Sequence, residues 1–459
     1  MLNKLINPEI QDLLIKKNFA VLKEIVDELE LADVAEIVAD LPENLRAIFF
    51  RILHTNLAAD VFEYIEPETQ LEIIKSLSNA EAAKILNEMS PDDRTSFLEE
   101  LPSSVTKKLI GLLNTEEREI ALSLLAYPEY SVGRLLTTDF IAVTQDMTIA
   151  AAFDYIRKYG NDSETVNVIY VVNEQDILID DIKIRTLIFA NPNQKIEEIL
   201  DKNYISLNVY DDQEKAIEYF KKYDRVALPV TDSAGVLLGM VTIDDVFDIA
   251  EEEATEDIHR FGGTEAIEEP YLNISLKRMI QKRAIWLSVL FLGELLTASV
   301  MAYFEEEISK AVVLALFVPL IISSGGNSGS QAATLVIRAM ALHEISIKNW
   351  FFVLKREIMS GIILGSILGI LGFLRVFIWG KYLGVYGEYW MLIGFTVSFA
   401  LIGVVTWGTL MGGMLPILLK KIGLDPATSS APFVATLVDV VGIIIYFSFA
   451  FFLLKGTLL

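Results

Sequence analysis

Cysteine is absent from this chain of 459 residues, and histidine occurs only at His54, His259 and His343. The missing cysteines exclude a disulfide framework and any thiolate metal site, and three scattered histidines argue against zinc chemistry. The N-terminus also lacks a basic flank followed by an apolar segment, so we expect no cleavable signal peptide. We therefore expect the soluble part of the chain to remain in the cytoplasm.

Charge and hydrophobicity are divided unequally along the chain. The chain is 53% hydrophobic and carries a net charge of −25, while its mean hydropathy is +0.42. Residues 1–283 account for all of that negative charge, because residues 284–459 hold nine acids and ten bases. A soluble half this acidic is not expected to bind nucleic acid or anionic lipid, and it attracts cations.

Residues 1–130 repeat a short helical theme. Amphipathic stretches end at Leu41-Pro42, Leu77-Ser78 and Leu101-Pro102, and short polar turns separate them. Units of this kind bury their apolar stripes by stacking on their neighbours. The pattern predicts an all-α superhelical N-domain.

Residues 131–245 carry a β-rich pattern that occurs twice. Each copy is predicted as strand, helix, strand, strand, helix, and this order resembles a tandem pair of α/β CBS domains. The predicted elements are 140–143, 149–159, 168–172 and 182–187 in the first copy, and 204–207, 213–223, 227–230 and 237–243 in the second.

The end of the second copy is close to the CBS signature. It reads Gly239-Met-Val-Thr242-Ile-Asp244-Asp245-Val246. In CBS domains this Thr and the second Asp contact the ribose of an adenine nucleotide, so the resemblance implies Thr242 and Asp245 as nucleotide contacts. The first copy has Thr186 where the second Asp is expected, which leaves ATP as an open possibility for the pair.

Residues 246–283 are predicted as a connecting segment. Asp245, Asp248, Glu252 and Glu256 are three or four residues apart, which places their carboxylates on one face of a helix that Gly262-Gly263 ends. Such a face is either an exposed connecting helix or one that cations neutralise. The amphipathic stretch 276–283 is expected as a second helix at the membrane surface.

Five hydrophobic segments follow in 284–459, near 284–303, 311–341, 352–379, 390–419 and 427–454, and each is long enough to span a bilayer. The sequence thus predicts a multi-pass protein with a five-helix α transmembrane domain. Ten Lys and Arg residues fall on the side of the soluble half and four on the other side. This bias predicts a cytoplasmic N-terminus and a C-terminus outside.

Asp439 is the only charge in the apolar stretch 426–454. A central Asp costs on the order of 3 kcal/mol to insert, so it needs a cation, a proton or water. Pro432 is expected to free backbone carbonyls near it. The second span is also polar from Ser323 to Thr334, and we expect loosely wound backbone there, lining a pore or packed through its glycines. Such a lining suits hydrated Mg²⁺, which prefers oxygen ligands.

The domain order and two membrane motifs resemble the MgtE magnesium channels. The motifs are Gly325-Gly326-Asn327-Ser-Gly-Ser-Gln331 and Asp425-Pro-Ala-Thr-Ser-Ser-Ala-Pro432-Phe-Val-Ala-Thr436-Leu-Val-Asp439. The resemblance implies a homodimer in the lipid bilayer, with Mg²⁺ as the transported ion and a pore on the two-fold axis. It assigns the pore contacts to Asp439, Ala435, Thr436, Gly325 and Asn327.

The same resemblance implies a cytosolic Mg²⁺ sensor that closes the pore. Intracellular Mg²⁺ would bind between acids of the N-domain, the CBS pair and the connecting helix. The matching positions are Glu214, Asp224, Asp245, Asp248, Glu253, Glu256, Asp425 and Asp93, with Asp92 as an alternative to Asp93.

Three other functions are weighed against this channel. An ion-coupled carrier would use Asp439 to bind a proton or sodium and a divalent metal in turn. A nucleotide-controlled regulator would use the membrane part as an anchor. A membrane metalloprotease is disfavoured, because His343-Glu344 lacks the second histidine of H-E-x-x-H.

Overall fold

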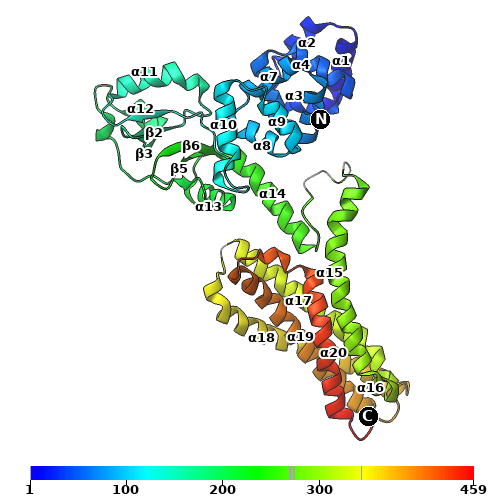
Figure 1. Ribbon diagram of the computed structural model, residues 1–459. Helices are drawn as coiled ribbons and strands as arrows, with labels where there is room; N and C mark the ends of the chain where they lie inside the picture. The colour runs from blue at the N-terminus through cyan, green and yellow to red at the C-terminus, as the bar shows by residue number, and fades with distance from the viewer. Residues whose placement is uncertain (1, 268–270, 272–273, 343, 459) are drawn as a thin grey trace. The chain divides into compact units, whose positions relative to one another are not determined.

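The computed structural model describes residues 2–267, 271, 274–342 and 344–458, so His343 lies outside the described residues. The chain forms two compact units, Met1–Ala250 and Glu251–Leu459. Figure 1 labels the helices and strands of both units.

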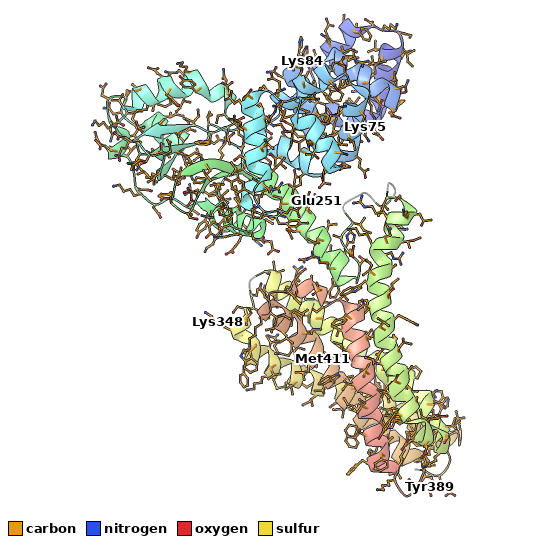
Figure 2. The ribbon with its side chains drawn as sticks, in the orientation of Figure 1. Lys75, Lys84, Glu251, Lys348, Tyr389 and Met411 are labelled. Carbon is orange, nitrogen blue, oxygen red and sulfur yellow. The ribbon has the colours of Figure 1, made fainter. Side chains whose placement is uncertain are left out.

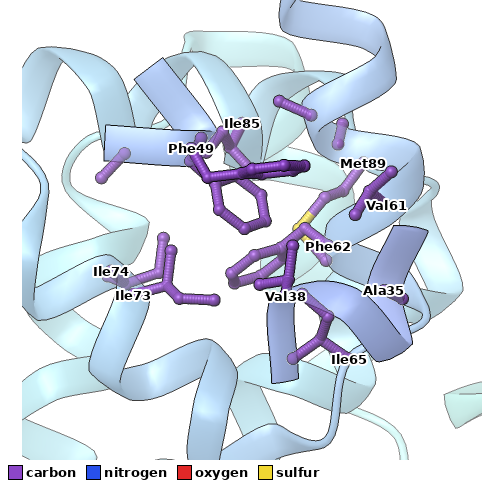
Figure 3. Close-up of a cluster of buried hydrophobic side chains, with 14 of the residues drawn as sticks. Ala35, Val38, Phe49, Val61, Phe62, Ile65, Ile73, Ile74, Ile85 and Met89 are labelled. Carbon is purple, nitrogen blue, oxygen red and sulfur yellow. The ribbon is translucent and has the colours of Figure 1, made fainter. Parts of the chain in front are cut away.

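The first unit begins with helices joined by short turns. Proline in the first turn starts α6 and α8, and Ser78 and Glu81 form a capping box at α7. Their apolar faces meet in one core, part of which Figure 3 shows around Phe49 and Phe62. In this core the rings of Phe62 and Phe97 lie 5.4 Å apart. The helices are α1 (Leu2–Ile15), α2 (Phe19–Val26), α3 (Leu31–Asp40), α4 (Glu43–Ile52), α5 (Thr55–Glu63), α6 (Pro67–Ser76), α7 (Asn79–Glu88), α8 (Pro91–Glu99), α9 (Ser103–Ile110) and α10 (Thr115–Leu125).

Two three-stranded sheets follow in the same unit. In each, the first strand pairs parallel with the second, and the second pairs antiparallel with the third. The first repeat contains β1 (Ala142–Thr144), α11 (Ile149–Tyr159), β2 (Val168–Val172), β3 (Leu178–Lys183) and α12 (Ile184–Phe189). The second contains β4 (Leu207–Asn208), α13 (Gln213–Tyr223), β5 (Ala227–Thr231), β6 (Leu237–Thr242) and the start of α14 (Ile243–Phe261).

One predicted strand is wrong. Residues 182–187 were expected as a strand, but the strand is Leu178–Lys183 and residues from Ile184 begin helix α12. Every second residue of β3 is buried, and Asp180 is buried between Leu178 and Ile182. Asp180 accepts hydrogen bonds from the backbone N–H groups of Asp201 and Lys202 at 3.0 and 2.9 Å, which explains how a carboxylate fits there.

Among the residues that the structure describes, the second unit contains five helices long and apolar enough to cross a membrane. They include α15 (Leu276–Tyr303), α17 (Val318–Ala341), α18 (Trp350–Phe377), α19 (Trp390–Lys421) and α20 (Ala431–Leu454), with the short α16 (Glu305–Lys310) after the first. Lys348, just before α18, and Tyr389, just before α19, lie at opposite ends of the bundle formed by α17 to α20 (Figure 2). The stretch 276–283 was expected as a separate surface helix and instead forms the first two turns of α15.

Glycines bring the backbones of α17 and α19 together. A Cβ on Gly408 would collide with the carbonyl oxygen of Gly325, and one on Gly412 with that of Gly329. Both pairs repeat every four residues, which is the small-residue spacing of close helix contacts in membranes. The expected loosely wound backbone is therefore not observed, because residues 323–334 lie within the continuous α17. The glycines of this motif serve close packing.

Candidate functional site

Asp439 lies half-buried on α20, on the same line of the helix as Ala431 and Ala435. Pro432 stands in the first turn of α20, where its missing N–H breaks no helical hydrogen bond. It therefore leaves the helix continuous up to Asp439, in contrast to the expectation that it frees carbonyls near the carboxylate. This line of residues is the centre of the candidate pore site.

Helix α17 packs against one side of this line. A Cβ on Gly326 would lie 3.4 Å from the Cβ of Ala435, and the hydroxyl of Ser330 donates to the carbonyl oxygen of Ala431 at 3.3 Å. Because the earlier residue of α17 meets the later residue of α20, the two helices run antiparallel. The two polar membrane motifs therefore face each other.

Helix α15 packs against the other side. The indole N–H of Trp286 donates to the hydroxyl of Ser430 at 3.2 Å, and Gly293 lies against Thr436. One turn deeper, the charge of Glu294 acts on Asp439. Glu294 is not among the site residues predicted from the sequence.

The other predicted pore residues have different surroundings. Thr436 is buried, and its hydroxyl donates to the carbonyl oxygen of Pro432 at 3.0 Å. This hydrogen bond lies within α20. Gly325 packs against Val404 and Val438. Asn327 is exposed on a polar stripe of α17, whose members lie three or four residues apart: Ser323, Asn327, Gln331 and Thr334.

A second set of acids gathers in the first unit, where Asp93 of α8 acts on Asp245 of α14. Burial raises the pKa of Asp245 to about 7, Thr242 opposes the shift through a hydrogen bond, and the charge of Asp93 adds to it. Burial also raises the pKa of Asp93, on which Asp244 and Asp248 act in the same direction. The structure thus brings three predicted sensor residues, Asp93, Asp245 and Asp248, into one electrostatic cluster.

Three more acids belong to this N-domain and CBS cluster. Burial and the charge of Asp93 raise the pKa of Glu63 to about 8. Burial raises the pKa of Asp92 well above its usual value, with Asp245 adding to the shift, and the pKa of Glu164 also rises through burial first. Glu63 and Glu164 lie far from α14 in sequence, so no spacing pattern could have found them. Within the described ranges, no three His, Asp or Glu side chains form a ready-made metal site.

In the second unit, Arg260 of α14 joins two predicted sensor residues. Its guanidinium forms ion pairs with Glu256, one turn earlier, and with Asp425. Burial raises the pKa of the adjacent Asp257 to about 6, and the charges of Asp425 and Glu253 add to the shift. The guanidinium of Arg260 therefore lies between Glu256 and Asp425, two of the acids predicted to belong to the Mg²⁺ sensor.

Glu214 and Asp224 are not brought together. They lie at the two ends of α13, Glu214 in its first turn and Asp224 as its left-handed C-cap with φ 51°. Ten residues of α-helix separate them by about 15 Å along the axis. One ion cannot contact both side chains of a single chain in this conformation.

The two predicted nucleotide contacts lie next to each other. The hydroxyl of Thr242 donates to the carboxylate of Asp245 at 2.6 Å. A cavity of about 400 Å³ beside Thr186 is lined by residues of both repeats, and there Arg225 forms an ion pair with Asp181 at 2.8 Å. Asp245 therefore belongs both to the predicted nucleotide contacts, together with Thr242, and to the N-domain and CBS cluster of acids.

Family models match three parts of the chain. Residues 29–130 match the MgtE intracellular N domain, residues 196–252 a CBS domain, and residues 318–449 the MgtE divalent cation transporter domain. The chain is 34% identical to the magnesium transporter MgtE of Thermus thermophilus over 97% of this chain and 98% of the relative. The chain belongs to the MgtE family of magnesium transporters.

Two further MgtE proteins are similar to this chain. The magnesium transporter MgtE of Bacillus subtilis is 30% identical, with 93% of each chain covered. A crystal structure of the cytosolic domain of the Mg²⁺ channel MgtE in complex with ATP is 31% identical and superposes with a TM-score of 0.50, covering 53% of this chain and 99% of that one. The MgtE resemblance found in the sequence is thus confirmed.

The MgtE family model for the transporter domain includes α17, α19 and α20, and so both polar motifs. It begins after α15, which carries Glu294. MgtE proteins form a transporter family and not an enzyme class.

Proposed function

We propose that this protein is a Mg²⁺-selective channel for magnesium uptake that intracellular Mg²⁺ closes. The observation that carries the proposal is Asp439, half-buried on a line of α20 between the polar motif of α17 and the carboxyl group of Glu294. Mg²⁺ keeps several of its waters and is held through one or two carboxylates. A carboxylate beside polar helix surface meets those requirements inside a bilayer.

The working unit in this proposal is a homodimer. Helix α15 has no buried residue among those described, and the stripe of α17 exposes amide side chains at membrane depth. Amide and carboxyl groups facing lipid are unfavourable, whereas groups facing a water-filled path or another helix are not. A second copy that covers these faces supports a pore between the subunits.

The proposed orientation follows from the basic residues. The helix ends that carry Lys420 and Lys421, Lys355 and Arg356 belong to the cytoplasmic side, together with Arg338. The N-terminus is then cytoplasmic and the C-terminus outside. Intracellular Mg²⁺ reaches the acidic clusters from that side, and ATP is proposed to bind at Thr242 and Asp245, in line with the ATP complex of the similar cytosolic domain.

The test is Mg²⁺ uptake by the full chain in liposomes. We expect Asp439→Asn to abolish uptake while the protein still inserts and elutes at the wild-type size. Glu357→Gln is the matched control, because it neutralises another acid within a membrane helix, on α18. Wild-type uptake by Asp439→Asn would contradict the pore assignment, and single-channel currents separate a channel from an ion-coupled carrier.

A further inference from the structure

We propose that the cytoplasmic end of α18 binds the phosphate headgroup of an anionic phospholipid. The surface combines five exposed basic residues with three exposed aromatic rings, and we call it the α18 basic patch. The cations are Lys348, Lys355 and Arg356 at the start of α18 and Lys420 and Lys421 at the end of α19, and the rings are those of Trp350, Phe351 and Phe352. The inference goes beyond ion transport and is independent of Asp439. Only the choice of leaflet rests on the proposed orientation.

Helices α18 and α19 bring these residues to one end of the bundle. Gly413 of α19 lies against the side chain of Glu357 of α18. Nearer the end of the bundle, Ile417 of α19 and Val353 of α18 belong to one buried cluster, so the two helices run antiparallel. Lys421 lies one turn beyond Ile417, at the level of the short 3₁₀ turn that precedes α18 and that α19 also contacts.

The length of α18 places the patch at the membrane surface. Its 28 residues extend over about 42 Å, and the hydrocarbon core of a bilayer is only about 30 Å thick. The first turns therefore lie among the lipid headgroups, where tryptophan is enriched. Lys355 and Arg356 follow Phe351 and Phe352 by one turn. Because helical side chains lean toward the N-terminus of their helix, both cations reach back toward Lys348, which Figure 2 labels at this end of the bundle.

The protein does not balance the charges of the patch. Lys282 of the same unit forms an ion pair with Glu265 at 3.8 Å, but among the described residues the five cations of the patch have no such ion pair. The acids in these segments are Glu344, which is exposed, and Glu357, on which the charge of Arg356 acts. Five cations beside two acids leave a positive surface on a chain whose net charge is −25. Such a surface attracts phosphate groups.

A phospholipid suits this surface better than a protein does. A second copy joined here through a two-fold axis would bring the same cations face to face. The acidic half of the chain would match the charge, but it would leave the rings of Trp350, Phe351 and Phe352, which are 49%, 63% and 63% exposed, without apolar cover. An anionic phospholipid supplies a phosphate for the cations and an acyl chain for the rings.

The experiment titrates the full-length protein in an uncharged detergent with phosphatidylglycerol or with phosphatidylcholine and follows the melting temperature. EDTA removes divalent ions, which bind the same phosphates. We expect phosphatidylglycerol to stabilise the wild type at a concentration about tenfold lower than phosphatidylcholine does. Each cation beside an anionic lipid contributes about fivefold in affinity, so the triple variant Lys348→Gln, Lys355→Gln and Arg356→Gln should need about 100-fold more phosphatidylglycerol. Its response to phosphatidylcholine should not change.

Two matched triple variants serve as controls. Lys84→Gln, Lys107→Gln and Lys108→Gln remove three exposed cations of the N-domain and should respond to phosphatidylglycerol like the wild type. Lys348→Arg, Lys355→Arg and Arg356→Lys keep the charge of the patch and should keep the response, which separates lost charge from misfolding.

Four outcomes overturn the inference. The first is an equal response of the wild type and the triple glutamine variant to phosphatidylglycerol, and the second is loss of the response in the variant that keeps the charge. The third is a wild type that does not respond while the triple glutamine variant melts lower without lipid, because protein then covers the patch. The fourth is equal stabilisation by inorganic phosphate at the same concentration, because the site then binds a free anion and not a lipid.

Discussion

Gly412 shows at the scale of one residue what the membrane motif requires. Its Cα lies against the backbone of α17, where an added Cβ would collide with the carbonyl oxygen of Gly329. Backbone cannot move aside as a side chain can, so overpacking here is expected to cost about 1–3 kcal/mol. We expect Gly412→Ala to lower the thermal stability of the detergent-solubilised protein.

Gly326→Ala is the control for this substitution. Its Cβ would meet Ala435 at 3.4 Å, which is an ordinary contact, so stability should stay close to that of the wild type. Equal melting temperatures for the two variants would show that α17 and α19 are not packed as closely as described.

Single residues also show how far the site could be predicted. Asp439 was predicted because it is a lone acid in an apolar span, and the same reasoning applies to Glu294, the lone acid of the first span. Arg260 was missed for another reason. Its partner Asp425 lies 165 positions away, and no spacing in the sequence connects them.

At the scale of elements, the helices of the CBS repeats were the most predictable. Helices α11 and α13 have the predicted bounds, because both are amphipathic and each begins after a side chain that caps it. The end of β3 could not be predicted, since the run from Ile182 to Leu187 is apolar at both strand and helix positions. The segment Ser323 to Thr334 was expected to have loosely wound backbone. It is helical instead, and its glycines pack against the facing glycines of α19, which lie far away in the sequence.

The acidic face of α14 should make the first unit sensitive to pH. Glu63 and Asp245 have folded pKa values raised to about 8 and about 7, so the folded state holds more protons than the unfolded one between about pH 4 and pH 8. This contribution to the free energy of unfolding is present below the unfolded pKa and is lost as pH rises through the folded pKa. We therefore expect the melting temperature to fall as pH rises over that window, and added Mg²⁺ to restore it at the upper end.

A soluble fragment of residues 1–261 suits this measurement, since the similar cytosolic domain has been crystallised by itself. Glu63→Gln should flatten the pH dependence, whereas Glu68→Gln, on an exposed face of α6, should not. A melting temperature that rises with pH in the absence of divalent ions would contradict the raised pKa values of the acidic cluster.

At the scale of the whole molecule, α14 is a single helix of 19 residues that supplies acids to two clusters. Asp245 and Asp248 belong to the cluster with Asp93, and Glu256 and Asp257 to the one with Arg260 and Asp425. Like charges repel when divalent ions are scarce, and bridging ions remove the repulsion when they are abundant. Helix α14 therefore carries residues of both clusters, and the proposed closure by Mg²⁺ would act along it.

The triple variant Asp245→Asn, Asp248→Asn and Glu253→Gln tests this coupling. We expect it to conduct Mg²⁺ at internal concentrations that close the wild type, because the ions lose the carboxylates that hold the closed state. Patch recordings with Mg²⁺ varied on the cytoplasmic face measure the closure directly. The control removes three exposed acids of the N-domain, Glu9, Glu68 and Glu116, and so matches the change in net charge. If both triple variants close like the wild type, α14 does not sense the ion; if both stay open, net charge and not this helix controls the gate.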